Sequence, residues 1–259
     1  AQSPVRELDR LPEGAKHTRC RRRALSEDEI QAFLAAAAED DRRCASAQAS
    51  ARKSRQYGLG LRLVDAPPPP RIPQLPFWKT LVDLGPRYGE TVAACWGDLD
   101  VDAATLVLRA ETTKSGRERL LPLPETLLAE LVALRRVHEA VLGRPVGAGE
   151  RLFLTPEGCP WPRPSNNVNR IFRRVLKAAG IERVDERGEK LDVHALRGTA
   201  ASRLARTGTP VAVAQRLLGH ADARTTLKHY VHVGMEEMRA AVEGLPGQEH
   251  GSDASTRAS

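Results

Sequence analysis

Four residues near the C-terminal end of the sequence have side chains and a spacing that suit chemistry on a phosphate ester. His194 and Arg197 form an H-x-x-R motif at the expected start of a helix, which places both side chains on one face. An L-G-H motif ends at His220, and a T-x-x-x-Y-x-H motif contains Tyr230. Arginine forks bind phosphate oxygens, histidine transfers protons near neutral pH, and a tyrosine hydroxyl can act as a nucleophile.

The H-x-x-R motif alone is weak evidence, because the motif is frequent by chance and an exposed surface pair explains it better. Its helix also carries Leu196, Ala200 and Leu204 at a spacing of four residues, which predicts a separate buried stripe. We therefore expect His194 and Arg197 to be free to meet a ligand. The three motifs together, in this order, are much harder to obtain by chance.

The combined pattern resembles the C-terminal signature of the tyrosine site-specific recombinases, the family of phage integrases and chromosome-dimer resolvases. Residues 84–90 (LGPRYGE) are similar to the family's G-L-R-x-x-E motif, although Pro86 stands where the family has an apolar residue such as leucine. A lysine between two β-like runs matches the catalytic lysine of the family's β-hairpin. The resemblance spans about residues 24–233 and assigns six catalytic positions: Arg87, Lys114, His194, Arg197, His220 and Tyr230.

The resemblance implies a division of labour among these six residues. Tyr230 would be the nucleophile that forms a covalent 3′-phosphotyrosyl link to DNA, and the two arginines with His220 would bind the phosphate oxygens. Lys114 would protonate the leaving 5′-oxygen, and His194 would act as general base at the tyrosine hydroxyl. No metal or cofactor is expected, because the arginines take over the electrostatic role of a cation.

The composition is consistent with a nucleic-acid partner but does not establish one. The 259-residue chain has a net charge of +7 and an isoelectric point near 9.6, and arginine far outnumbers lysine. An Arg-rich, high-GC genome would give the same bias, so charge alone does not decide. We expect double-stranded DNA as the partner, contacted by a basic set of side chains on the entering segment and the hairpin: Arg21, Arg22, Arg23, Lys114 and Arg117.

Other classes of protein fit the sequence poorly. Hydrophobic residues make up 41% of the chain, enough for a globular core, and no apolar run approaches the roughly 18 residues of a membrane span. The four cysteines are scattered without a C-x-x-C pair, which argues against a disulfide framework or a zinc ribbon. We expect a cytoplasmic, nucleoid-associated protein of bacterial, phage or mobile-element origin.

The elements that must position these residues are mostly helical. The predicted fold class is mainly α with a small antiparallel β-sheet (α+β), that of a tyrosine recombinase catalytic domain. An S-x-x-E capping box at Ser26 starts the first helix. Gly208 and Gly219 are expected at helix ends, with Thr209 as an N-cap before Pro210 at the first helical position. Helices are predicted near 77–84, 125–141, 164–179, 193–206, 210–218 and 222–230, and β-strands near 105–108 and 119–123.

The domain organisation predicted from the sequence has three parts. Residues 1–23 are interpreted as a linker, the trailing end of a missing N-terminal DNA-binding domain. Residues 24–245 form the catalytic domain with a Pro-rich insertion at 40–76, and residues 246–259 form a disordered tail. Strand exchange implies a homo-tetramer on DNA, and residues 234–244 have the apolar spacing of a helix that could dock in trans on a neighbour.

Three alternatives stay open. A recombinase-like DNA-binding protein without catalysis would share the fold, and a type IB topoisomerase-like enzyme would share the chemistry without exchanging partners. A metal site made of His220, His229 and His232 would explain neither Arg87 nor Lys114. The other tyrosines, Tyr57 and Tyr88, fit packing better than nucleophilic attack.

Overall fold

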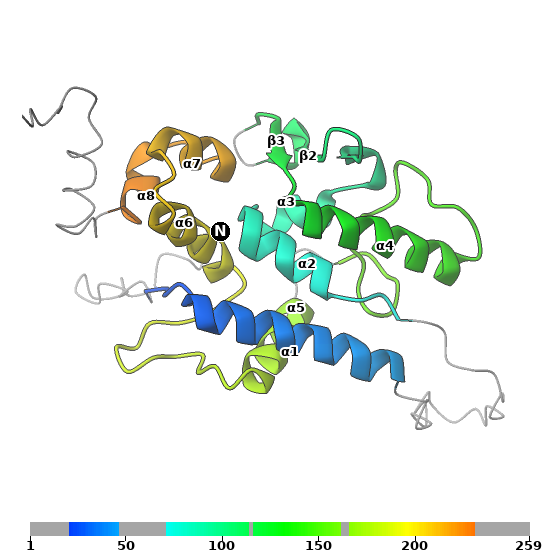
Figure 1. The fold of residues 1–259 in the computed structure, drawn as a ribbon, viewed down its shortest axis with the longest axis horizontal. Helices are drawn as coiled ribbons and strands as arrows, with labels where there is room; N and C mark the ends of the chain where they lie inside the picture. The colour runs from blue at the N-terminus through cyan, green and yellow to red at the C-terminus, as the bar shows by residue number, and fades with distance from the viewer. Residues whose placement is uncertain (1–20, 47–70, 114–115, 162–165, 231–259) are drawn as a thin grey trace, which may run out of the picture.

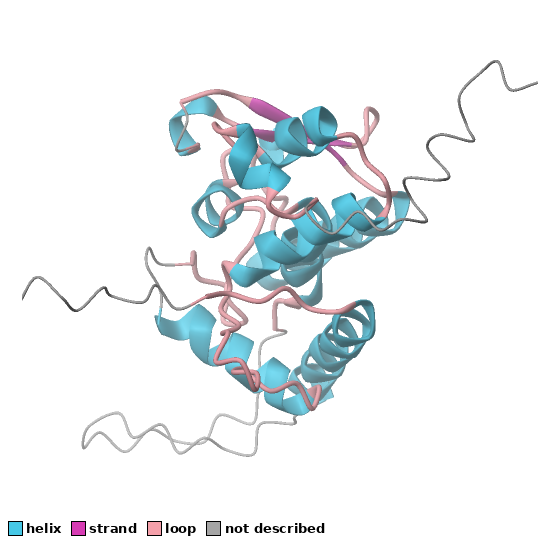
Figure 2. Ribbon diagram, turned by 90° about the vertical axis from the view of Figure 1, so that its left-hand side faces the viewer, coloured by secondary structure: helices cyan, strands magenta, loops and turns pink. Residues whose placement is uncertain are grey.

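The computed structural model describes residues 21–46, 71–113, 116–161 and 166–230. Helices dominate this part of the chain and the strands gather at one end of it (Figures 1 and 2), so the predicted mainly helical class is confirmed. None of the described helices is long and apolar enough to cross a membrane. The elements are α1 (Glu27–Ser46), α2 (Leu75–Lys79), the π-helical η2 (Thr80–Leu84), α3 (Tyr88–Ala93), η3 (Trp96–Asp98), β1 (Leu99–Asp100), β2 (Thr105–Leu108), η4 (Ala110–Thr112), β3 (Arg119–Pro122), α4 (Glu125–Leu142), α5 (Asn166–Ala178), α6 (Ala195–Arg206), α7 (Val211–Leu218) and α8 (Ala223–Leu227).

Helix α1 begins at the predicted capping box. The Ser26 hydroxyl accepts the Glu29 N–H at 3.1 Å, and the Glu29 carboxylate accepts the Ser26 N–H at 2.9 Å. Phe33 on the buried face lies edge-on against Trp78 and is tilted against Phe172, with ring centroids 5.6 and 5.5 Å apart. Each fully buried aromatic of this kind contributes about 1.5–3 kcal/mol, so the cluster fixes α1 against α2 and α5.

The boundaries predicted for the Pro-rich insertion, 40–76, are wrong at both ends. Residues 40–46 continue α1, and α2 already begins at Leu75. The reason is tertiary: the Asp41 carboxylate accepts the backbone N–H groups of Gln74 and Leu75, both at 2.8 Å, and so caps α2 from α1. Asp40 is buried and pairs with Arg174 of α5 at 2.5 Å. Residues 47–70, which include the proline run, lie outside the described residues, and their role as an insertion stays a prediction.

The strands form one three-stranded antiparallel sheet in the order β1-β2-β3. Leu106 pairs with Leu121, and Leu108 pairs with Arg119. Leu106, Leu108 and Leu121 are buried against the core, whereas Leu120 on the opposite face is 59% exposed, as alternation along a strand requires. The predicted antiparallel sheet is confirmed, with the two-residue β1 as an additional strand too short to show a period.

The C-terminal helices α6, α7 and α8 follow one another closely and bring α7 beside β3 (Figure 1). Gly208 and Gly219 have φ of +68° and +67°, which confirms the predicted left-handed helix ends. Two boundaries differ from expectation. Pro210, rather than Thr209, is the N-cap of α7. Helix α8 ends at Leu227 instead of residue 230. Beyond it, the backbone N–H groups of His229 and Tyr230 bond to carbonyls three residues earlier, which gives tight turns in place of a further α-helical turn.

One core histidine makes the stability of this fold depend on pH. His138 is 1% exposed and accepts the indole N–H of Trp96 at 3.3 Å. Burial lowers the pKa of His138 from 6.5 to about 4. As the pH falls, such a histidine takes up its proton in the unfolded chain before it does so in the folded protein. The free energy of unfolding therefore decreases between about pH 6.5 and about pH 4, by up to roughly 3 kcal/mol.

We therefore expect His138→Gln, which keeps an acceptor for Trp96 but does not titrate, to lose less stability than the wild type between pH 6.5 and 4. Chemical denaturation at several pH values measures the difference between the two proteins. Asp41, whose pKa burial raises to about 6, changes stability in the opposite direction over this pH range. Because Asp41 is present in both proteins, its effect cancels in the difference, which then reports His138. Parallel pH profiles for the two proteins would contradict the assignment.

Candidate active site

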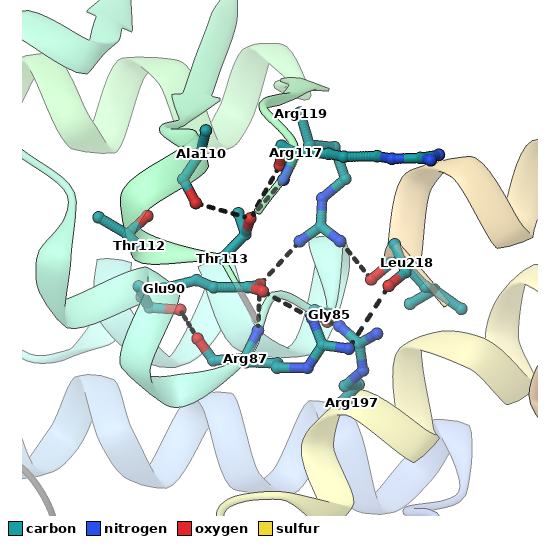
Figure 3. A network of polar contacts seen from close by, with 12 residues as sticks. Gly85, Arg87, Glu90, Ala110, Thr112, Thr113, Arg117, Arg119, Arg197 and Leu218 are labelled. Carbon is teal, nitrogen blue, oxygen red and sulfur yellow. Dashed lines mark hydrogen bonds and ion pairs between the residues drawn. The ribbon is translucent and has the colours of Figure 1, made fainter. Parts of the chain in front are cut away.

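Arg87 stands at the N-terminus of α3, where a buried carboxylate holds it. Its backbone is extended, and its N–H donates to Glu90 Oε2 at 2.9 Å. Arg87 Nη1 donates to Glu90 Oε1 at 2.7 Å, and Nη2 reaches the carbonyl of Gly219 at 3.4 Å (Figure 3). Burial alone would raise the pKa of Glu90, but the Arg87 N–H bond and the charge of Arg119 outweigh it, and the net pKa is lowered. Glu90 is therefore an ionised anchor for Arg87.

Arg197 projects from α6 into the same region. It is only 6% exposed, although its position lies off the predicted apolar stripe of this helix. Its Nη1 donates to the carbonyl of Gly85 at 2.8 Å, whereas its buried Nη2 has no hydrogen-bond partner among the described residues. Burial and the neighbouring charge of Arg87 lower the pKa of Arg197 to about 10, so it stays charged at neutral pH. A buried cation with an unused donor is suited to an incoming anion.

Gly85 allows α6 and α7 to approach this arginine pair. It ends η2 in the left-handed region with φ +64°. A Cβ atom there would lie 2.7 Å from Leu218 of α7 and 2.8 Å from Ala200 of α6. Any larger residue would therefore separate the helices that carry Arg197 and the L-G-H turn.

His220 follows the glycine that ends α7, and its ring is oriented by a residue of α8. The Nδ1 atom lies 2.9 Å from the hydroxyl of buried Thr226. Burial, and then the charge of Arg197, lower the pKa of His220 to about 4, so the ring is neutral at pH 7. If the threonine hydroxyl donates to Nδ1, the proton sits on Nε2, which can then donate to a phosphate oxygen.

His194 occupies the N-cap position of α6 and its side chain reaches solvent. The nearby Asp192 carboxylate accepts the Ala195 N–H at 2.9 Å and pairs with Arg22 at 2.7 Å. Surrounding protein and then the charge of Arg22 lower the pKa of His194, which favours the neutral form that a general base requires.

The Tyr230 hydroxyl is held away from the two arginines. It donates to the backbone carbonyl of Thr209, between α6 and α7, at 2.6 Å. Partial burial raises the pKa of Tyr230. The preceding His229 is fixed by Ser202 of α6, whose hydroxyl lies 3.1 Å from its Nδ1. The structure thus brings Arg87, Arg197 and His220 together but leaves the tyrosine hydroxyl on a different partner.

Arg119 is a member of this cluster that the sequence analysis missed. It leaves β3 with only 9% of its side chain exposed and donates from Nη2 to Glu90 Oε2 at 2.8 Å. Its Nη1 donates to the carbonyl of Leu218 (Figure 3). Residues 119 and 121 lie on the core-facing side of the strand. A buried position is unusual for an arginine, so its alternation with Leu121 in the sequence could have indicated a paired, functional side chain. Thr226 was visible in the T-x-x-x-Y motif but was given no role.

The predicted DNA-contacting residues have different surroundings. Arg21 and Arg117 are exposed, and in Figure 3 the Arg117 side chain extends away from the Glu90 network. Arg22 pairs with Asp192, and Arg23 makes a two-pronged contact with Glu29 at 2.7 and 2.8 Å. Lys114 lies outside the described residues, so its placement on the hairpin stays a prediction.

Within the described ranges no group of three histidine, cysteine or acidic side chains is arranged to hold a metal ion. His220 and His229 are instead bound to Thr226 and Ser202, respectively. His232, the third member of the alternative metal site, lies outside the described residues.

Comparison with known proteins identifies the family and the fold of the chain. A family model described as "Phage integrase family" matches residues 23–237. Tyrosine recombinase XerD of Caulobacter vibrioides is 30% identical over 226 residues, which cover 85% of this chain and 61% of that protein. The catalytic domain of bacteriophage HP1 integrase superposes with a TM-score of 0.52 at 19% identity, covering 89% of this chain and 99% of the domain. A XerH recombinase bound to its difH substrate, in a post-cleavage complex, gives 0.54 at 19% identity, covering 85% and 52%.

The chain belongs to the phage integrase family of tyrosine recombinases, since the family model covers most of its length. It spans less than two thirds of the XerD relative. The two structural matches, below 25% identity, establish the fold of a tyrosine recombinase catalytic domain.

Proposed function

We propose that this chain cuts and rejoins double-stranded DNA in site-specific recombination, through a covalent 3′-phosphotyrosyl intermediate at Tyr230. The observation that carries the proposal is the unused, buried Nη2 donor of Arg197 beside Arg87 and His220. Three neighbouring donors, of which the Arg197 guanidinium is buried, suit the oxygens of one phosphodiester, and fixed charge at a developing anion is a large catalytic effect.

In the proposed reaction the Tyr230 oxygen attacks phosphorus and the bond from phosphorus to the 5′-oxygen breaks. The tyrosine proton passes toward His194, and Lys114 donates a proton to the leaving 5′-oxygen. The phosphodiester is replaced by a phosphotyrosyl ester of similar energy. A 5′-hydroxyl from the partner strand can therefore reverse each step and rejoin the DNA without another energy source.

The hydrogen bond to the carbonyl of Thr209 must be exchanged before this attack. The raised pKa of Tyr230 means that the hydroxyl is protonated at neutral pH, so its proton needs an acceptor at the phosphate. His194 is suited to that role because its lowered pKa keeps the ring largely neutral.

Recombination requires more than the residues of one catalytic site. We propose that Arg21, Arg22, Arg23, Lys114 and Arg117 contact the DNA backbone and that four protomers assemble around two duplexes. Arg22 and Arg23 would exchange their carboxylate partners in part for phosphate. Residues 234–244, outside the described residues, would dock as a helix on a neighbouring protomer. The family relationship and the DNA-bound XerH structure support the proposed contact with DNA, and a cytoplasmic, nucleoid-associated location follows from it.

Incubation of the full chain with nicked duplexes that carry a randomised central segment tests the proposal. Cleavage near the nick releases a short 5′-hydroxyl fragment, so the covalent complex cannot be reversed and accumulates. We expect an adduct that survives SDS and disappears on protease treatment. Absence of the adduct would overturn the enzymatic proposal in favour of a catalytically silent DNA-binding protein.

The same preparation separates a recombinase from a type IB topoisomerase-like enzyme. Sequencing across the junctions of two differently marked duplexes should detect exchanged partners if four protomers act together. Relaxation of a supercoiled plasmid without any exchanged junction would support the topoisomerase-like alternative instead.

A further inference from the structure

We propose that Arg119 is a positioning residue for DNA cleavage. From β3 it binds both the Glu90 carboxylate, which holds Arg87, and the turn that precedes His220. This inference rests on the proposed function, because it assumes that the chain cleaves DNA. The contacts of Arg119 do not depend on that function. Arg119 itself is too buried to meet the DNA, with 9% of its side chain exposed.

The first contact places Arg119 and Arg87 on the two oxygens of one carboxylate. Glu90 Oε1 accepts Arg87 Nη1 at 2.7 Å, and Oε2 accepts Arg119 Nη2 at 2.8 Å. The Glu90 side chain is fully buried, so it has no water to compensate for a lost partner. Without Arg119, Oε2 would keep only the backbone N–H of Arg87, at 2.9 Å. The carboxylate could then turn about this bond and engage the Arg87 guanidinium with both oxygens, which would draw that guanidinium away from the phosphate.

The second contact locks the turn before His220. Arg119 Nη1 donates to the carbonyl of Leu218, the last residue of α7, and thus satisfies a helix-end acceptor that lacks an intrahelical partner. The neighbouring Gly219 has no side chain, and a Cβ atom there would overlap the Arg119 guanidinium. The glycine of the L-G-H motif is therefore required twice, for its left-handed φ of +67° and for the space that Arg119 occupies.

The third argument is electrostatic. Arg87, Arg119 and Arg197 surround a single carboxylate, so the cluster carries three positive charges against one negative charge. Burial lowers the pKa of Arg119, and Glu90 opposes that effect. Holding this excess of positive charge in the absence of an anion is unfavourable for the fold, and it favours the additional negative charge that develops on the phosphate during the attack.

Arg119→Met tests the proposal in the adduct assay. We expect the rate of adduct formation at saturating DNA to fall roughly 10- to 100-fold, the cost of a small misplacement of reacting groups. The DNA dissociation constant should change little, since Arg119 does not face the DNA. Removal of its charge should also raise the pKa of His220 measured by NMR, because that charge contributes to its depression.

Arg144→Met is the matched control: it removes the same charge and a two-pronged contact, here with Glu150 on the surface at the end of α4. It should leave the adduct rate, DNA affinity and His220 pKa unchanged. Arg119→Lys should restore the low pKa of His220 but only part of the rate, because one ammonium cannot reach Glu90 and Leu218 together in the arginine geometry.

If Arg119→Met does not fold, Gly219→Ala provides the second variant, since it displaces the guanidinium while keeping its charge. A wild-type adduct rate in either variant would overturn the proposal, as would a rate loss that Arg144→Met reproduces. If the wild-type chain forms no adduct, the proposed function fails on its own. The NMR comparison of His220 then still decides whether the charge of Arg119 acts on the histidine of this turn.

Discussion

Replacing Tyr230 by phenylalanine is expected to abolish the covalent adduct, by more than roughly 10⁴-fold, because no other group in the site supplies the attacking oxygen. The loss removes one oxygen atom and leaves the ring in place. In the structure this oxygen bonds only the carbonyl of Thr209 among the described groups, so the fold should lose at most about 1 kcal/mol of stability. DNA binding should be retained, and a gel-shift assay beside the SDS assay measures the two properties separately.

The control for this variant is Tyr88→Phe, which tests the other tyrosine in the described part of the chain. Tyr88 lies beside Arg87 and its ring packs edge-on against Phe77 at 6.3 Å. It should still form the adduct. An adduct that persists in Tyr230→Phe would mean that the nucleophile has been wrongly assigned, and peptide mapping of the DNA-linked residue would then identify it.

Those parts of the site that carry a sequence motif were predictable. The H-x-x-R, L-G-H and LGPRYGE motifs contain Arg197, His220 and Arg87, respectively. The charge of Arg87 contributes to the lowered pKa of Arg197, and both arginines contribute to the lowered pKa of His220. The helix ends at Gly208 and Gly219 were predictable because left-handed backbone strongly favours glycine. Local chemistry determines the helix ends, whereas the grouping of Arg87, Arg197 and His220 was an implication of the family resemblance.

The remaining features depend on contacts between distant segments. The continuation of α1 through Asp40 and Asp41 follows from partners more than 30 residues away in the sequence. Arg119 was taken as part of a β-like run, although its two acceptors lie 29 and 99 residues away. The burial of Arg197 could not be read from its helix either, because the residues that cover it come from other elements. Non-local packing is the information that hydrophobic periodicity omits.

The buried state of Arg197 leads to the second large prediction. Arg197→Met should reduce adduct formation by about 10²- to 10³-fold, the usual cost of removing a donor to a developing oxyanion. Arg197→Lys should be nearly as damaging, because the ammonium cannot hold the carbonyl of Gly85 and also present a second donor to the phosphate. Single-turnover rates at saturating DNA measure both variants.

Stability should respond in the opposite direction. The pKa of Arg197 is lowered well below the usual arginine value, to about 10, chiefly by burial. The charged group is thus less stable in the fold than in the unfolded chain at every pH below about 10, by roughly 3 kcal/mol. Loss of the hydrogen bond to Gly85 costs about 1–3 kcal/mol in Arg197→Met, so the two effects nearly cancel or favour the variant. We expect a Tm equal to or above that of the wild type.

This combination distinguishes an anion-binding arginine from a structural one. If Arg197 served the fold, Arg197→Met would lower the Tm and the adduct rate together. If it is held ready for a phosphate, sulfate should raise the Tm of the wild type by occupying the site and should do so much less in Arg197→Met. Arg203→Met is the matched control, since Arg203 lies on the same helix and pairs with Asp83 at 2.7 Å. Its Tm should fall modestly with the loss of that pair, while its stabilisation by sulfate should equal that of the wild type, because the site at Arg197 is intact.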